Sequence, residues 1–175
     1  MNRLKFAFLL FGIFVSSFGV LTFEISLTRI FSVMYSYHYT FLAVSVALLA
    51  LSLGGVLSQV TSRKITSDGV FSRLALISLV YSFAASFLLF VMLSVPTLGV
   101  LTDLFFMFVP FLLAGVFLAM IYRIFVNFSN ILYFADLLGA AIGALAVVFL
   151  LNSVGAVQGI LLVSIFIAIS SLVFA

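Results

Sequence analysis

Six long apolar runs, separated by short polar breaks, restrict the folds open to this chain more than any other feature. An apolar run of about 20 residues is long enough to cross the hydrocarbon core of a bilayer as a helix. Of the 175 residues, 67% are hydrophobic and only 6% are charged, which leaves no room for a soluble domain. The sequence therefore predicts an all-α integral membrane bundle of six transmembrane helices, with spans at about 6–28, 40–59, 74–93, 103–122, 131–151 and 156–175.

The two ends of the sequence bear on what the chain is. The first apolar run is longer than the 7–15 residues of the hydrophobic region of a signal peptide, and no clean small-residue cleavage site follows it, so we interpret it as a retained span. The last run stops at residues 172–175 without a basic or aromatic anchor after it. We therefore expect the 175 residues to be the membrane part of a longer chain with a cytosolic domain.

The basic residues predict the orientation of the spans. Arg29 falls on one side of the predicted membrane, and the six other Lys and Arg residues fall on the opposite side: Arg3, Lys5, Arg63, Lys64, Arg73 and Arg123. Basic residues concentrate in cytoplasmic loops of membrane proteins. The pattern predicts a multi-pass protein of the cell (inner) membrane with both termini in the cytoplasm. Three spans before and three after the middle loop also give the parity of a 3+3 inverted repeat.

The fifth span places a carboxylate beside a row of small residues. Ala135, Gly139 and Gly143 recur every fourth residue, so they form one helix face on which another backbone can come close in lipid. Asp136 adjoins that face, and an ionisable side chain within a span normally faces a bundle interior, a cavity or an opposite charge. We therefore expect this helix to lie at the centre of the bundle, with Asp136 in a cavity open to the cytoplasm or paired with Arg123.

Other polar side chains are candidates for lining a cavity. Glu24 lies ~27 Å along the first helix from Phe6, near the predicted outer face, and is ~140° around the axis from Arg29, so the two are poorly placed for a salt bridge. Arg29 is typical of a side chain that reaches the headgroups, and His38 of an aromatic interfacial belt. The candidate cavity residues are Glu24, Arg29, His38, Tyr133 and Asp136.

Two further features predict structure rather than chemistry. Asp103 follows Thr102 at the start of the fourth span and is typical of a helix cap. Gly54 and Gly55 indicate close helix packing.

Several kinds of chemistry are excluded by what the sequence lacks. It has no Cys and one His, which removes thiolate and multi-histidine metal sites. Residues 53–55 contain two glycines but no following Lys-Ser or Lys-Thr pair, so they are not a phosphate-binding loop. The sparse charge excludes nucleic acid as a partner. The sequence predicts no catalytic residue, no metal and no bound cofactor within these 175 residues.

Three segments together resemble the membrane half of the multi-pass spermidine synthase-like proteins, which are polyamine aminopropyltransferases. Residues 18–29 resemble the family's first-span pattern of Gly, an apolar run, Glu and then Thr-Arg; residues 49–55 and 133–144 resemble its second-span and fifth-span motifs, and Pro110 and Gly115 match its fourth span. This sequence has Ser26-Leu27 before Thr28, where an aromatic residue is common in the family. The resemblance implies that a cytosolic Rossmann-like synthase domain, in cis or in trans, would use decarboxylated S-adenosylmethionine.

The resemblance leaves three functions open. The chain is the membrane module of such an aminopropyltransferase, with Glu24 and Asp136 shaping a cavity or docking the soluble domain. Alternatively, it is a small carrier of a polyamine or another solute, as in half of a major-facilitator transporter. As a third possibility, it is a scaffold that only anchors a partner to the bilayer or forms a homodimer through the Gly139 face.

Overall fold

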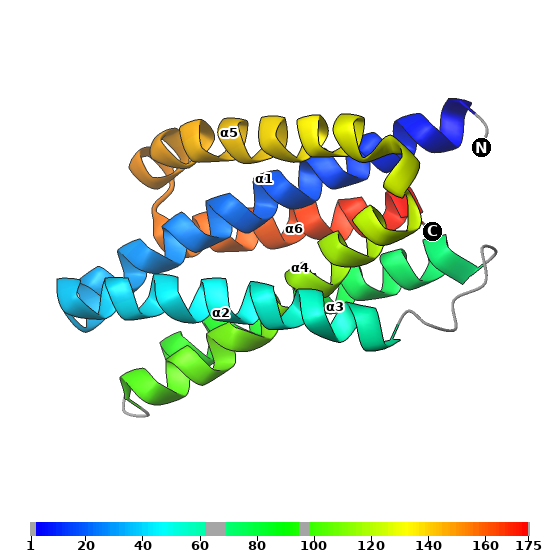
Figure 1. The fold of residues 1–175 in the computed structure, drawn as a ribbon. Helices are drawn as coiled ribbons and strands as arrows, with labels where there is room; N and C mark the ends of the chain where they lie inside the picture. Colours follow the sequence, from blue (N-terminus) through cyan, green and yellow to red (C-terminus); the bar gives the residue numbers. More distant parts are fainter. Residues whose placement is uncertain (1–2, 62–68, 95–98, 175) are drawn as a thin grey trace.

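The computed structural model of this protein describes residues 3–61, 69–94 and 99–174, and in these residues it is all-helical. Figure 1 shows elongated helices lying side by side, with both chain ends at the same end of the bundle. We call that end the terminal end and the opposite end, with the α1–α2 turn, the distal end. The helices are α1 (Arg3–Met34), α2 (Tyr37–Thr61), α3 (Val70–Ser94), α4 (Val100–Ile124), α5 (Ser129–Ser153) and α6 (Ala156–Phe174), with a 3-10 turn, η4 (Val126–Phe128), before α5.

Five helices, α1 to α5, are long and apolar enough to cross a membrane, and α6 holds a shorter apolar stretch in the residues searched. The structure therefore agrees with a helical membrane bundle. The orientation was predicted from the basic residues, and the structure does not describe all of them. Outside the described part lie Arg63, Lys64 and the side chains of Arg3 and Lys5.

Most helices extend beyond the limits that hydropathy predicted. The first helix continues to Met34, and within its last part the Thr28 hydroxyl donates to the Ile25 carbonyl at 2.8 Å, so this polar group is paired inside the helix. Ser129 and Asn130, predicted to lie in a loop, belong to α5 instead, since the 3-10 turn alone joins α4 to α5. Residues 95–98, in the break between the third and fourth predicted spans, lie outside the described residues.

The expected central position of the fifth helix is wrong. The α5 helix lies at the edge of the bundle and packs almost entirely on α1, and it is the least buried of the five long helices (Figure 1). The α1 helix has the central role, with α2, α5 and α6 packed against it. The small-residue face of α5 is therefore a contact with a single neighbour, and its remaining surface is available to lipid.

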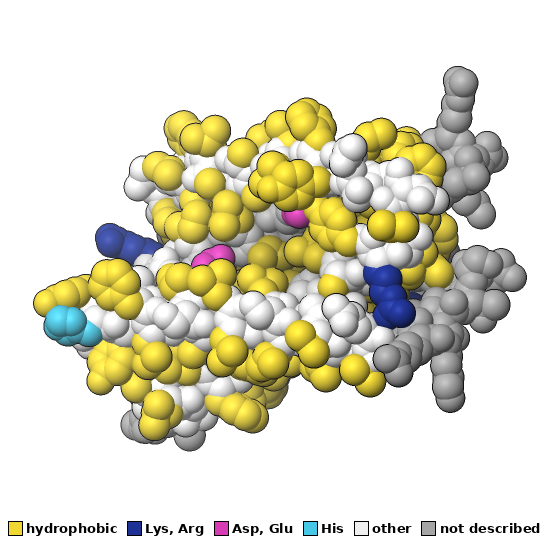
Figure 2. Space-filling model, in the orientation of Figure 1, with side chains coloured by type: hydrophobic (Ala, Val, Ile, Leu, Met, Phe, Trp, Pro, Cys, Tyr) yellow, Lys and Arg dark blue, Asp and Glu magenta, His cyan; other side chains and the backbone are white. Residues whose placement is uncertain are grey.

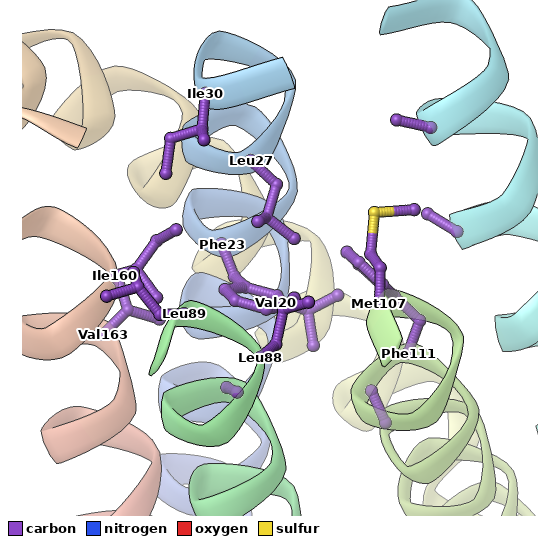
Figure 3. Packing of buried hydrophobic residues seen from close by; sticks show 14 of the residues in the cluster. Val20, Phe23, Leu27, Ile30, Leu88, Leu89, Met107, Phe111, Ile160 and Val163 are labelled. Atoms are coloured by element: carbon purple, nitrogen blue, oxygen red, sulfur yellow. The ribbon is translucent and has the colours of Figure 1, made fainter. Parts of the chain in front are cut away.

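The main core lies where α1, α3, α4 and α6 meet. Figure 3 shows Phe23 of α1 among side chains of α3, α4 and α6, and its ring centroid lies 5.3 Å from that of Phe111. Side chains such as Phe23, Phe111 and Met107 are almost fully buried. This core fixes the rotation of α1 about its own axis, and so determines which face of α1 is left between α5 and α2.

Candidate functional site

A polar strip runs along the face of α1 that lies between α5 and α2. Ser17 and Glu24 are seven residues apart, which brings them to within ~20° of the same helix face. Figure 2 shows acidic side chains along the hollowed strip between α5 and α2. We call this strip the α1 groove and define it by Ser17, Leu21, Glu24 and Thr28 of α1 together with Asp136 of α5.

Asp136 is held in the α1 groove by two neutral hydroxyl groups. The Ser17 hydroxyl donates to one carboxylate oxygen of Asp136, and the Tyr122 hydroxyl of α4 donates to the other at 2.7 Å. Asp136 follows Ser129, the first residue of α5, by seven positions, which puts it ~10 Å into the helix and beyond the first turn. Its carboxylate therefore joins three helices and does not cap its own.

Arg123, the cation expected beside Asp136, is engaged elsewhere. In the last turn of α4 its guanidinium donates to the backbone carbonyl of Gln59 at 2.8 Å. Within the described part of the chain Asp136 forms no ion pair, so its charge is compensated only by hydroxyl dipoles.

Glu24 lies half-buried in the α1 groove, and among the described residues it has neither a hydrogen bond nor an ion pair. Tyr81 of α3 packs edge-on against Phe23, the neighbour of Glu24 in the chain; its side chain is 3% exposed, and its hydroxyl has no hydrogen-bond partner among the described residues. A carboxylate without a partner is costly within an apolar helix bundle, so Glu24 is the group of the groove that most needs a cationic or hydrogen-bonding partner.

The small-residue face of α5 holds Asp136 next to α1. The Gly139 backbone packs directly on the backbone carbonyl of Phe14, and Gly143 packs in the same way on Phe18. The Thr22 hydroxyl also approaches the Gly143 carbonyl, at 3.4 Å. Only residues without a side chain allow this approach, so these glycines position Asp136 beside Ser17.

The predicted glycine pair in the second span divides into two roles. Gly54 packs on the backbone of α4 at Leu112, whereas a β-carbon added at Gly55 would meet the Ala119 side chain at an ordinary contact distance of 4.0 Å. Gly54 is therefore a close helix contact, and Gly55 lines a cavity with Ser58 and Arg123.

Only two of the five candidate cavity residues share the α1 groove. These are Glu24 and Asp136. Arg29 is exposed at the distal end, where it lines two other cavities. His38 is exposed, with its ring centroid 3.8 Å from that of Tyr37, and Tyr133 is 57% exposed on the outer side of α5. The structure places these three side chains away from the groove.

The spacing of the two carboxylates limits what the α1 groove can hold. Ser17, which is bonded to Asp136, and Glu24 are seven residues apart, a rise of ~10 Å along α1. The two acids therefore belong to different levels of the groove, and the described residues hold no cluster of three or more His, Cys, Asp or Glu side chains that could hold a metal ion. The apolar side chain of Leu21 lies between them on α1. This arrangement suits a ligand with two cationic groups joined by an aliphatic chain.

Ser17 and Tyr122 were not predicted from the sequence as site residues. Ser17 could have been predicted from the sequence, because it lies seven residues before Glu24 in an apolar run and therefore on the same helix face. Tyr122 could not have been predicted, since nothing in the sequence shows that the end of α4 reaches α5.

Comparisons with models of known protein families, with curated proteins and with solved structures found no match to this chain. The features of this chain that bear on its function are the geometry of the α1 groove and the resemblance of residues 18–29, 49–55 and 133–144 to the spermidine synthase-like proteins.

A third carboxylate, that of Asp103, is buried and joins two elements at the distal end. Asp103 is 2% exposed and accepts a hydrogen bond from the Tyr35 hydroxyl at 2.5 Å. The expected capping role is wrong, because the cap of α4 is Gly99 and no side chain caps that helix. Asp103 instead fastens the α1–α2 turn to α4.

The Tyr35 hydroxyl should make stability fall at alkaline pH. Burial, together with the hydrogen bond to Asp103, raises the pKa of Tyr35 from 10.0 to about 12. Because the folded state holds this proton more tightly, its contribution is complete below pH ~10 and is lost as the pH rises toward ~12. We expect Tyr35→Phe to flatten the fall in melting temperature over this window, relative to the unchanged protein. Equal pH dependence of the two would contradict the assignment.

Proposed function

We propose that this chain is the membrane module of a spermidine synthase-like aminopropyltransferase and that its α1 groove binds a cationic amine. The observation that carries the proposal is that Glu24 and Asp136 lie along one groove between long apolar helices, and neither forms an ion pair among the described residues. An ammonium group donates strong, charge-assisted hydrogen bonds to a carboxylate. A polyamine supplies two such groups with an aliphatic chain between them, which matches the Leu21 side chain between the two acids.

The likeness of residues 18–29 and 133–144 to the synthase-like proteins gives the amine a chemical context. The first segment contains Glu24 and the second contains Asp136, so the two motifs supply the two acids of the α1 groove. In this proposal catalysis belongs to a cytosolic Rossmann-like domain that uses decarboxylated S-adenosylmethionine. The membrane module holds the amine substrate or product close to that domain.

The proposal includes six crossings of the cell membrane with both termini in the cytoplasm. It is supported by the common location of the two chain ends (Figure 1) and by the distribution of basic residues in the sequence. Reporter fusions test it: a reporter at Ser67 should be cytoplasmic and one at Gly99 external, and the reverse result would overturn the orientation.

Equilibrium binding of spermidine to the protein in lipid vesicles tests the amine site. We expect Glu24→Gln and Asp136→Asn each to weaken binding by about tenfold or more, because a hydrogen bond to a charged group contributes about 1.5–3 kcal/mol. Asp68→Asn is the matched control, since it removes a carboxylate from a polar segment between spans. Undetectable binding by the unchanged protein, or equal binding by all variants, would leave the anchoring scaffold as the better description.

A carrier function is the second candidate, and the pairing of the helices favours it. The α1 helix packs on α5 and α6, and α4 packs on α2 and α3. If α1, α2 and α3 are matched in order to α4, α5 and α6, the contacts of α1 with α5 and α6 become the contacts of α4 with α2 and α3. This exchange is expected of an inverted repeat of the kind found in secondary transporters. Spermidine flux into vesicles that contain this chain alone would favour a carrier, whereas binding without flux would favour the synthase module.

A further inference from the structure

A cavity of about 630 Å³ opens at the distal end and shares Arg29 and Leu151 with the smaller cavity that borders α2. It lies between the end of α1, the ends of α3 and α5, and the start of α6. Its volume is within the range of small-molecule sites, which are mostly apolar with a few polar groups that orient the ligand. The polar groups here are Arg29, Asn152 and Gln158, and the walls include Ile30, Leu93 and Val157.

Arg29 determines the charge of the ligand that this cavity would accept. It is the only charged side chain in the lining, and within the described residues it forms no ion pair with an acid. A guanidinium presents a planar set of donors that matches a phosphate or carboxylate group. The amide side chains of Asn152 and Gln158 add neutral donors beside it, so the polar part of the cavity is suited to an anion.

The location of the cavity determines the rest of the ligand. The cavity lies where four helices end or begin at the distal end, the level at which lipid headgroups meet the ends of membrane spans. The aliphatic part of the lining includes Ile30, Leu93 and Val157, contributed by three different helices at their distal ends. A long Arg side chain at such a depth keeps its charged head at the interface.

We propose that this cavity binds an amphiphile that consists of an anionic head, held by Arg29 and the amides of Asn152 and Gln158, and an acyl chain along the aliphatic wall. The site uses none of the α1 groove residues and does not depend on the amine proposal. Two sources share this chemistry, an anionic phospholipid and a free fatty acid, and they can be distinguished experimentally.

Native mass spectrometry of the purified protein tests the proposal with phosphatidylglycerol, phosphatidylcholine and oleate as probes. We expect phosphatidylglycerol or oleate to be retained in preference to phosphatidylcholine. Arg29→Gln should weaken retention of the preferred probe about fivefold, the ratio that corresponds to ~1 kcal/mol for one basic residue near anionic lipid. The probe that shows this dependence identifies the source of the ligand.

Two further variants separate the cavity from general charge effects. Arg73→Gln removes the same charge from an exposed position in α3 that does not line the cavity, and retention should be unchanged. Val148→Trp adds bulk at a lining position that is 55% exposed, so it should reduce retention without disturbing the core. Equal retention of phosphatidylglycerol and phosphatidylcholine, no loss of either anionic probe in Arg29→Gln, or an equal loss in Arg73→Gln would overturn the proposal.

Discussion

Gly139→Leu should destabilise the bundle more than any other single change considered, because it removes the close contact between α5 and α1. Even a β-carbon at residue 139 would overlap the backbone carbonyl of Phe14, and a backbone cannot move aside as a side chain can. Overpacking a well-packed contact costs about 1–3 kcal/mol or more, and each kcal/mol lowers the melting temperature of a protein of this size by ~2–4 °C. We therefore expect a decrease of about 5 °C or more in detergent.

Ala141→Leu is the control for that experiment. Ala141 lies on the same helix but is exposed, so the same increase in volume should be accepted by lipid or detergent. A Gly139→Leu protein that melts like the Ala141→Leu protein would mean that α5 does not pack on α1 through this face.

Asp136→Leu should both weaken the fold and abolish amine binding, whereas Asp136→Asn should affect mainly binding. Leucine leaves the hydroxyls of Ser17 and Tyr122 without an acceptor, and a buried donor left unpaired costs about 1–3 kcal/mol. Asparagine keeps one carbonyl oxygen that can accept a hydrogen bond, but it loses the charge that an ammonium group would contact. Melting temperature and spermidine affinity, measured on both variants, separate the two effects.

The companion variants locate the cause of any loss. Ser17→Ala and Tyr122→Phe each remove one donor to Asp136 and leave its charge in place, so both should retain spermidine binding better than Asp136→Asn. If Asp136→Leu melts and binds spermidine as the unchanged protein does, Asp136 is neither a structural contact nor a ligand.

The helical class of the fold could be predicted from the sequence, because the length and polarity of an apolar run determine whether it can be a membrane-spanning helix. The position of each helix in the bundle could not. The small residues of α5 correctly indicated a face suited to close contact, yet that face meets only α1, and the helix lies at the edge. A row of glycines specifies how near a neighbour may come, and it does not specify how many neighbours there are.

The candidate site was predictable where one helix contains all the information and unpredictable where several helices meet. Glu24 and Asp136 are identifiable as acids within apolar runs, whereas the bond from Tyr122 to Asp136 depends on how α4 meets α5. Asp103 shows the same limit. Its place in the first turn of α4 suggested a cap, but its partner is Tyr35, from the turn that follows α1.

The affinity of the protein for a series of α,ω-diamines of increasing length tests most directly whether one ligand contacts both acids of the α1 groove. Because Ser17 and Glu24 are ~10 Å apart along α1, affinity should rise with chain length until the two ammonium groups can reach both carboxylates. Glu24→Gln and Asp136→Asn should each remove this dependence and leave the weak binding of a single ammonium group. An affinity that does not change with diamine length, or a length dependence that persists in both variants, would contradict the account.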